Sequence, residues 1–384
     1  MFGYLVSRRR LPALSRVALA AALLGALPSA WAEPLDLKKE AQAIAAAQLE
    51  KLGSSYRANY DAAHRLIYVS ALDDTHLQET VALLSAYCDA QQKTLFSTPL
   101  PWNVAVVLPT VDDYKPLAPG KDITGFYEPK DRVLISIDRG RVLLHEFTHA
   151  LHHAQMASLR QVHPVWICEG LATLFECCDI DEKGVGPLVD LRLPGLQKAL
   201  RTGSALTLEK LLQADHDRFN RDAIVCYAQS RYLMLYLQQR GLLKKWYDAY
   251  TDGFSDDPSG KAALEKVLGK RLFEVEDDWK SWVLALRLPW NEGRSDQGRL
   301  GVEVQADEQG VKVVGLIRGS AGEKAGLIKA GDVIKTFNGQ AISNPVEFIA
   351  AVRSTGALRT VSVELIRNEQ KVVVLQPMGS AKAD

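Results

Sequence analysis

The chain has 384 residues, and its 46 lysine and arginine residues are matched by 46 aspartate and glutamate residues. This balance gives no indication of a nucleic-acid-binding surface. Hydrophobic residues make up 47% of the sequence, enough for two domains with proper cores.

Residues 1–32 have the pattern of a secretory signal peptide. Four arginines between positions 8 and 16 precede an apolar run over residues 17–27, and Ala30 and Ala32 fit a cleavage site before Glu33. Without this segment the chain has 42 basic against 46 acidic residues. We therefore expect an exported protein of the bacterial periplasm or the extracellular space. The alternative is that residues 1–32 form an uncleaved membrane anchor. No other segment approaches the roughly 20 apolar residues of a membrane span.

The first part of the mature chain alternates helices and strands. Helices are predicted over residues 37–51 and 76–96, and strands over residues 65–70 and 103–108. A further strand over residues 132–137 is expected at a sheet edge, where an extended substrate could pair with it. Its alternating apolar residues are equally typical of any half-buried strand.

The most informative motif is His145-Glu146-Phe147-Thr148-His149, which is flanked by apolar residues at 142–144 and 150–151. On a helix, residues four positions apart share one face, so His145 and His149 can each give a nitrogen to one tetrahedral metal ion. Glu146 lies close enough to accept a proton from metal-bound water. The pattern predicts a Zn²⁺ hydrolase; a helix that carries two histidines by chance is the alternative.

A catalytic zinc needs three protein ligands and an open position for water. Glu169 is the best candidate for the third ligand, because residues 164–173 are predicted to begin a second helix after a short connection. If this helix packs antiparallel to the first, Glu169 returns to the metal. The sequence therefore predicts a metal site of His145, His149 and Glu169.

Three histidines are rival ligands: His152, His153 and His163. The first two lie further along the motif helix, where a third ligand reaches a shared metal badly. We interpret His152 and His153 as residues of the helix surface or neighbours of the ligands, and His163 as a loop residue before a proline.

These motifs resemble those of the gluzincin peptidases, the thermolysin-like and aminopeptidase-like zinc proteases with a downstream glutamate ligand. The resemblance rests on the zinc motif, on Glu169-Gly170-Leu171-Ala172, on Tyr227-Ala228-Gln229-Ser230 and on the strand residues around Gly125–Tyr127 and 132–137. It covers roughly residues 55–288. It implies an α+β fold with a thermolysin-like, or peptidase MA-like, zincin domain of mixed sheet and helices.

The resemblance also implies a mechanism. Glu146 would be the general base towards a zinc-bound water, and Tyr227 would stabilise the tetrahedral intermediate, with His216 as second choice. A core aromatic residue is the alternative role for Tyr227. Two positions depart from the family: Cys168 stands where aminopeptidases have asparagine, and Thr173 stands where thermolysin-like enzymes have an aspartate that orients a zinc histidine.

Five cysteines in an exported chain permit two disulfides and leave one cysteine over. The sequence leaves their pairing open. They are Cys88, Cys168, Cys177, Cys178 and Cys226.

Residues 184–215 look mixed and loop-rich and are expected to contribute to the substrate cleft. Helices are predicted to resume over 223–240, 242–251, 260–268 and 272–286. Residues 291–297 read as a polar linker.

From residue 298 onward, short alternating strands with glycine turns resemble a PDZ domain of the kind attached to exported bacterial proteases. The matching residues are Arg299–Val302, Ser320–Leu327, Gly331–Ile334 and Asn338-Gly339. The resemblance implies that the backbone around Leu300, Gly301 and Val302 binds a peptide C-terminal carboxylate. A departure is Ala321, where proline is common. An occluded groove, or a purely supporting role for the domain, is the alternative.

We therefore expect a signal peptide over 1–32, a gluzincin-like zinc peptidase domain over 33–290, a linker over 291–297 and a PDZ domain over 298–378. The expected function is an exported, zinc-dependent endopeptidase that acts on peptides or proteins recruited by their C-termini. The alternatives are a noncatalytic zinc-binding PDZ scaffold of the cell envelope and an aminopeptidase with a PDZ tail. Blocked peptides would separate the last, because an endopeptidase cuts them internally.

Overall fold

The computed structural model describes most of the chain after the predicted signal peptide. The described residues are 36–96, 98–120, 123–182, 184–190, 192–287, 298–355 and 360–380. The predicted signal peptide and the predicted linker lie outside them. Among the described helices, none combines the length and apolar character needed to cross a membrane.

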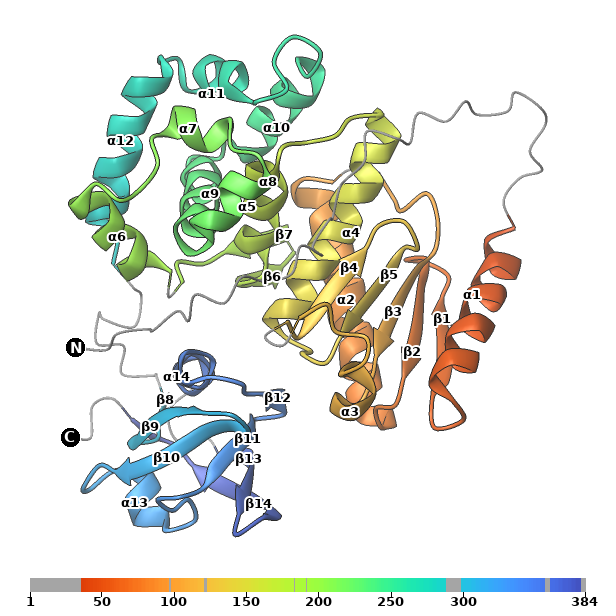
Figure 1. The fold of residues 1–384 in the computed structure, drawn as a ribbon, viewed down its shortest axis with the longest axis vertical. Helices are drawn as coiled ribbons and strands as arrows, with labels where there is room; N and C mark the ends of the chain where they lie inside the picture. Colours follow the sequence, from red (N-terminus) through yellow and green to blue (C-terminus); the bar gives the residue numbers. More distant parts are fainter. Residues whose placement is uncertain are drawn as a thin grey trace. The chain divides into compact units, whose positions relative to one another are not determined.

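A five-stranded mixed sheet organises the first part of the chain (Figure 1). Its two central pairings are parallel and its two outer pairings are antiparallel. The strands in spatial order are β1 (Arg57–Asp61), β2 (Leu66–Ser70), β3 (Val104–Leu108), β5 (Val133–Ser136) and β4 (Gly125–Glu128).

Both faces of this sheet are covered, because its strands alternate between two cores. Ile67 and Val69 share a core with helix α1 (Leu37–Leu52). Leu66 and Tyr68 point to the other face, into the main core that α2 (Asp74–Thr94) and α4 (Arg141–Leu159) help to form. A short helix, α3 (Val111–Tyr114), follows β3.

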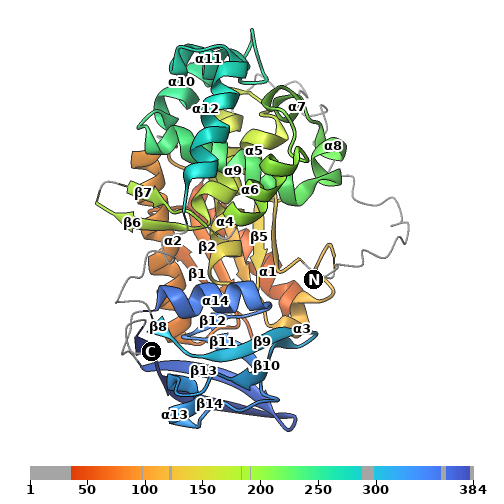
Figure 2. The ribbon, with the colours of Figure 1, turned by 90° about the vertical axis from the view of Figure 1, so that its left-hand side faces the viewer.

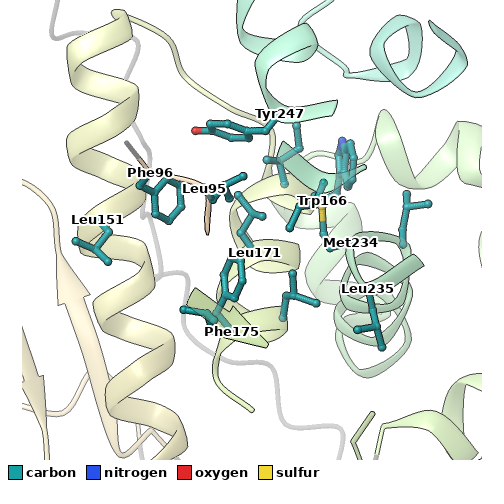
Figure 3. Packing of buried hydrophobic residues seen from close by; sticks show 14 of the residues in the cluster. Leu95, Phe96, Leu151, Trp166, Leu171, Phe175, Met234, Leu235 and Tyr247 are labelled. Carbon is teal, nitrogen blue, oxygen red and sulfur yellow. The ribbon is translucent and has the colours of Figure 1, made fainter. Parts of the chain in front are cut away.

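Helices dominate the second half of this region, with α5 (Val165–Phe175) and α9 (Ala223–Gln239) packed against each other (Figure 2). Gly170 permits the close approach, since a Cβ there would lie 3.2 Å from Met234. Figure 3 shows Trp166, Leu171 and Phe175 of α5 in this core. The remaining elements are β6 (Cys178–Asp181), β7 (Gly184–Pro187), α6 (Leu193–Thr202), α7 (Leu208–Leu212), α8 (His216–Arg221), α10 (Leu243–Asp252), α11 (Lys261–Leu268) and α12 (Leu272–Ala285).

The C-terminal region has its own core and its own main sheet. Helices α13 (Ala321–Ala325) and α14 (Pro345–Ser354) accompany it. The strands of the region are β8 (Gly298–Arg299), β9 (Val302–Asp307), β10 (Gly310–Leu316), β11 (Val333–Phe337), β12 (Gln340–Ala341), β13 (Thr360–Arg367), β14 (Gln370–Pro377) and β15 (Gly379–Ser380). The order in the main sheet is β14-β13-β11-β10-β9 with β12 on β11, and β8 pairs with β15 in a separate two-stranded sheet.

The predicted α+β class with a β-rich C-terminal domain is confirmed, and two strand predictions need correction. The strand expected at the edge, β5, lies inside the sheet, because β4 pairs with its outer side. Strand β1 was not predicted. It is only half-buried at best, so its apolar signal is weak.

The five cysteines are all unpaired. The disulfides that an exported chain permits are therefore not formed in this structure. Cys88 and Cys226 are instead buried among apolar side chains.

Candidate functional site

Helix α4 presents the two motif histidines side by side. Its apolar residues, among them Leu143, Phe147 and Ala150, are fully buried and fix the orientation of the helix. On the neighbouring face the Nε2 atoms of His145 and His149 lie 3.1 Å apart. Two imidazole nitrogens thus face the same point.

Helix α5 brings Glu169 to that point, as the sequence predicted. Its Oε2 lies 3.4 Å from Nε2 of His145 and 3.5 Å from Nε2 of His149. The ligand atoms of the three residues all lie within 4.8 Å of one another, and they form the one group of this kind within the described residues. The structure therefore places the three predicted ligands together.

The surroundings of Glu169 fit a positive ion. Its Oε2 is buried and has no hydrogen-bond partner, and a buried carboxylate oxygen without a partner is costly. Glu146 adds a further carboxylate beside the two imidazoles. A divalent cation held by two histidines and one glutamate would compensate this charge.

Glu146 lies on α4 between the two histidines, as the motif requires. Its Oε2 accepts a hydrogen bond of 2.9 Å from the backbone N–H of Tyr127 on β4. Burial raises the pKa of Glu146 above its ordinary value, against the opposing influence of His149 and His145. This carboxylate is therefore oriented by the sheet and is more basic than a solvated glutamate.

Tyr227 joins the site from α9, whereas His216 does not. Tyr227 is half-buried and lines one pocket together with His145 and Glu146. Burial, and after it the Glu169 carboxylate, raises the pKa of Tyr227, so its hydroxyl keeps its proton. His216 is exposed at the start of α8 and is not in the pocket wall.

Sequence reasoning missed Glu176, the residue that follows α5. Its Oε2 lies 2.9 Å from Nδ1 of His145 and so leaves the Nε2 of that ring for the shared point. Thr173, the position considered from the sequence, instead donates a hydrogen bond of 2.5 Å to the carbonyl of Glu169. The available signal was spacing, because Glu176 follows Glu169 by two helical turns and shares its face.

Around Glu176 lies a network of three arginines and two acids. Arg141 and Arg192 both pair with Glu176 and with Asp190. Arg231, which is fully buried, lies 3.3 Å from Asp190. Both acids are almost fully buried, and the arginines lower the pKa of Glu176 and of Asp190 below their ordinary values against the effect of burial.

His152 is buried rather than on the helix surface, and His163 lies in the predicted loop before Pro164 but is buried as well. Nε2 of His152 lies 2.8 Å from Nδ1 of His163, and the His152 ring stacks on Phe96. Burial lowers the pKa of both, that of His163 to about 3. The periodicity of α4 explains the error, since His152 falls on the same face as the buried Thr148 and Leu151. His153 is half-buried, with its Nδ1 3.0 Å from the Tyr127 hydroxyl.

In the C-terminal domain, the predicted carboxylate loop is anchored through its carbonyls. The Leu300 carbonyl accepts from Gly322 N–H at 2.7 Å, and the Gly301 carbonyl accepts from Ile317 N–H at 2.9 Å and from Ser320 Oγ at 3.0 Å. Gly301 has a φ of 72°, and a Cβ there would lie 2.1 Å from that of Ser320. Only glycine fits this position.

Comparison with known proteins adds a family for this domain. A PDZ domain model matches residues 298–374, which confirms the predicted C-terminal PDZ domain. A probable periplasmic serine protease of the Do/HhoA-like kind from Haemophilus influenzae is 39% identical over 88 residues, 20% of this chain. The chain spans about a fifth, 19%, of that relative's length. This relative also confirms the predicted export to the periplasm.

Two solved structures also match. A serine endoprotease from Yersinia pestis is 21% identical, with 28% of this chain and 36% of that chain covered and a TM-score of 0.21. The PDZ domain of HtrA3, bound to a phage-derived ligand, is 20% identical, with 22% of this chain and 89% of that chain covered and a TM-score of 0.19.

The comparisons contradict the zinc-dependent endopeptidase expected from the sequence. The curated relative is a serine protease, a class that attacks the peptide bond with a serine hydroxyl and needs no zinc. The metalloprotease class, the Zn²⁺ cofactor and the alternatives built on zinc are corrected accordingly. A five-residue motif fixes how side chains are spaced on a helix, and it identifies neither the ion nor the reaction.

A serine nucleophile would need a histidine partner. In the parts of the chain that the structure describes, no serine hydroxyl donates a hydrogen bond to a histidine ring. Ser85 and His64 share the carboxylate of Asp61, but Nε2 of His64 faces Asp89 rather than Ser85. This group therefore lacks the serine–histidine contact of a triad.

Proposed function

We propose that this chain is an exported peptidase, with a hydrolytic centre around Glu146 and a PDZ domain that binds peptide C-termini. The observation that carries the proposal is the convergence of His145, His149 and Glu169 on one point beside Glu146. Few other functions need two imidazoles and a buried carboxylate oxygen without a hydrogen-bond partner at one point, with a further carboxylate beside them.

His145, His149 and Glu169 are the residues that would hold a divalent cation. When bound, such an ion supplies a Lewis acid and lowers the pKa of a bound water. Glu146, held by the Tyr127 N–H, accepts the proton of the attacking water and later delivers it to the leaving amine.

The remaining residues stabilise and orient. The Tyr227 hydroxyl, which keeps its proton, donates to the oxyanion that develops on the attacked carbonyl. Glu176 keeps the His145 ring turned toward the shared point. A mixed sheet with two helices that present these residues supports a zincin-like fold for the region before the PDZ domain.

The PDZ domain would bind the C-terminal carboxylate of a substrate at Leu300, Gly301 and Val302. The anchored carbonyls of Leu300 and Gly301 support this role, because they hold the peptide planes of the loop in place. The solved HtrA3 PDZ domain carries a phage-derived ligand, a use that fits the same proposal for this chain.

The test is hydrolysis of internally quenched peptides by the mature protein and by Glu146→Gln. We expect the variant to lose activity by about 100- to 10,000-fold, the range for loss of a general base. Glu50→Gln, at an exposed position on α1, is the matched control and should keep full activity. Equal activity of Glu146→Gln and the parent would remove Glu146 from the mechanism.

Class-specific inhibitors decide between this centre and a serine nucleophile, the second candidate suggested by the Haemophilus relative. Loss of hydrolysis with a chelator, but not with a sulfonyl fluoride, would assign the reaction to the centre around Glu146. The opposite result would assign a serine-dependent reaction and leave the cluster around Glu146 without a catalytic role.

A further inference from the structure

We infer that Arg141 and Arg192 form a binding site for a carboxylate of the substrate, beside the hydrolytic centre. This inference rests on the proposed function and adds the class of substrate. The carboxylate belongs either to the free C-terminus of a short peptide or to an acidic side chain near the scissile bond.

The guanidinium groups of Arg141 and Arg192 use only part of their hydrogen-bonding capacity. Each holds the buried acids through a single terminal nitrogen. Nη2 of Arg141 pairs with Glu176 and lies 3.0 Å from Asp190, and Nη1 of Arg192 lies 2.5 Å from Glu176 and 2.7 Å from Asp190. A guanidinium has five N–H donors, and the other side-chain nitrogens of both arginines make no hydrogen bond to a described residue. Each arginine therefore keeps donors for a ligand.

The network contains more arginines than acids. Three guanidinium groups, those of Arg141, Arg192 and Arg231, surround only two carboxylates, those of Glu176 and Asp190. Arg231 is 0% exposed and already pairs with Asp190. Within this network the arginines carry one positive charge more than the two acids, and Asp138 and Glu146, which also line the pocket, form no ion pair with Arg141 or Arg192. An anion bound directly to the two arginines would balance the excess charge of the network.

The side chains of Arg141 and Arg192 are more exposed than the two acids. Glu176 and Asp190 are 6% and 2% exposed, whereas the side chains of Arg141 and Arg192 are 27% and 30% exposed. Both arginines line the pocket that also contains His145. The positively charged groups are therefore the open side of the network, and the acids are its closed side.

Arg141 and Arg192 lie close to the proposed hydrolytic centre. One carboxylate connects the arginines to the hydrolytic centre, since Oε2 of Glu176 contacts His145 and its Oε1 contacts Arg141 and Arg192. An extended peptide advances about 3.3–3.6 Å per residue. A carboxylate bound by the arginines is thus within about one or two residues of the attacked carbonyl.

Neutralisation of the buried acids alone does not explain the arrangement. Arg231 and one further arginine would match the two negative charges. A second, half-exposed arginine with unused donors is what planar, bidentate recognition of a carboxylate requires.

The experiment compares kcat/KM for three quenched peptides of one sequence. One has a free C-terminus next to the cleaved residue, one is amidated there, and one is amidated but carries glutamate in place of glutamine near the scissile bond. We expect a preference of about 10- to 100-fold for one of the two carboxylate peptides, the usual contribution of a hydrogen-bonded charge. The preferred peptide identifies the source of the carboxylate.

Variants then assign the preference to the pocket. Arg192→Lys keeps the charge and the pairing with the acids but loses the planar fork, so it should reduce the preference with less effect on the amidated peptide. Arg201→Gln, at an exposed position of α6, is the control and should keep the preference. Equal kcat/KM for all three peptides in the parent would overturn the inference while leaving the proposed peptidase intact.

A binding measurement keeps the two proposals separate. Calorimetry on Glu146→Gln with a short peptide acid and with its amide needs no turnover, and tighter binding of the acid, lost in Arg192→Gln, supports the carboxylate site. If no peptide is cleaved by the parent but the acid still binds, the proposed function fails and the anion site stands. Equal binding of acid and amide would count against the site.

Discussion

The two proposed sites of this molecule are built from different kinds of atoms. In the PDZ domain the binding loop is made of backbone, and its shape depends on one glycine with φ of 72° and on carbonyls that are hydrogen-bonded to the domain. In the first part, the site is made of side chains from α4, α5 and α9. A backbone site depends on turn residues at fixed spacing, whereas a side-chain site depends on where helices place each functional group.

This difference explains how the two parts compare with known proteins. The PDZ fingerprint consists of glycines and small residues, which a family model detects over residues 298–374. The centre around Glu146 depends on a handful of side chains spread over about 80 residues. Its function must therefore be tested by breaking individual residues, and each test should leave the PDZ domain unaffected.

The largest expected effect comes from Glu169→Ala. Without this carboxylate two ligands remain, so we expect loss of a bound divalent cation and at least about a 1,000-fold loss of hydrolysis. Elemental mass spectrometry of parent and variant measures the ion and identifies it. PDZ binding of a C-terminal peptide should be unchanged. A parent that folds, hydrolyses peptides and contains no ion would refute the ion-binding role of these residues.

The next effect concerns the stability of the first part alone. Arg231 is fully buried, donates to the carbonyls of Thr173, Leu174 and Leu188, and lies 3.3 Å from Asp190. Arg231→Met leaves these groups unpaired, and we expect a loss of about 3–5 kcal/mol in the free energy of unfolding. Thermal or denaturant unfolding measures it, with peptide binding by the PDZ domain as the internal control.

A contrasting variant checks the cause of that loss. Arg240 follows the last residue of the same helix, α9, and lies outside the network, where its guanidinium stacks on Tyr236; the contrasting variant is Arg240→Met. We expect a loss of about 1 kcal/mol or less from a removed cation–π contact. A similar loss in both variants would show that the network around Asp190 adds nothing specific.

Much of this architecture could be predicted from the sequence, because its signals are local. The helices around 37–51 and 272–286 follow from apolar spacing, and the i, i+4 histidines follow from helix geometry. The third predicted ligand, Glu169, needed only an antiparallel helix after a short connection. These inferences concern residues that are close in sequence, and for such residues the periodicity of the chain determines which side chains share one face of a helix.

The missed features depend on tertiary contacts. Glu176 reaches His145 from beyond the end of α5, and its arginine partners come from positions 141 and 192. The burial of His152 depends on Phe96 and on residues of α10. Helix spacing indicates which face Glu176 and His152 share, but it does not identify the partners that these residues meet there. Strand β1 escaped prediction for another reason, because it is mostly exposed and its apolar signal is weak.

Acidification separates the two parts by a smaller amount. The pKa of His163 is lowered to about 3 by burial and that of His152 is lowered as well, so the folded state binds fewer protons than the unfolded state below pH 6.5. Their stabilising contribution is full above pH 6.5 and is lost as the pH falls. Between pH 6.5 and 5 we expect His163 to account for a loss of about 2 kcal/mol. Unfolding curves at several pH values measure the slope.

The same experiment has a control within the chain. All eight histidines precede residue 217, so the PDZ domain has none and lacks this source of pH dependence. His163→Asn should flatten the slope of the first part, and His216→Asn, at an exposed position, should not. An unchanged slope in His163→Asn would mean that other groups cause the acid sensitivity.

The smallest effect tests the backbone site. Gly301→Ala forces a Cβ to within 2.1 Å of Ser320 Cβ at a φ of 72°, so the loop must move away from its anchored position. We expect at least about a tenfold loss of affinity for a C-terminal peptide, measured by calorimetry, since tenfold corresponds to only 1.4 kcal/mol. Hydrolysis of short peptides should stay at the parent level, because no atom of the centre around Glu146 changes.

Gly319→Ala is the matched control, since its φ is also positive, at 81°, but no atom lies within 4 Å of the added Cβ. Its backbone cost is similar, so a loss of affinity confined to Gly301→Ala assigns the effect to the carboxylate loop. Loss of short-peptide hydrolysis in Gly301→Ala would show instead that the two parts do not act independently. Peptide binding by the PDZ domain and hydrolysis at the centre around Glu146 would then be coupled.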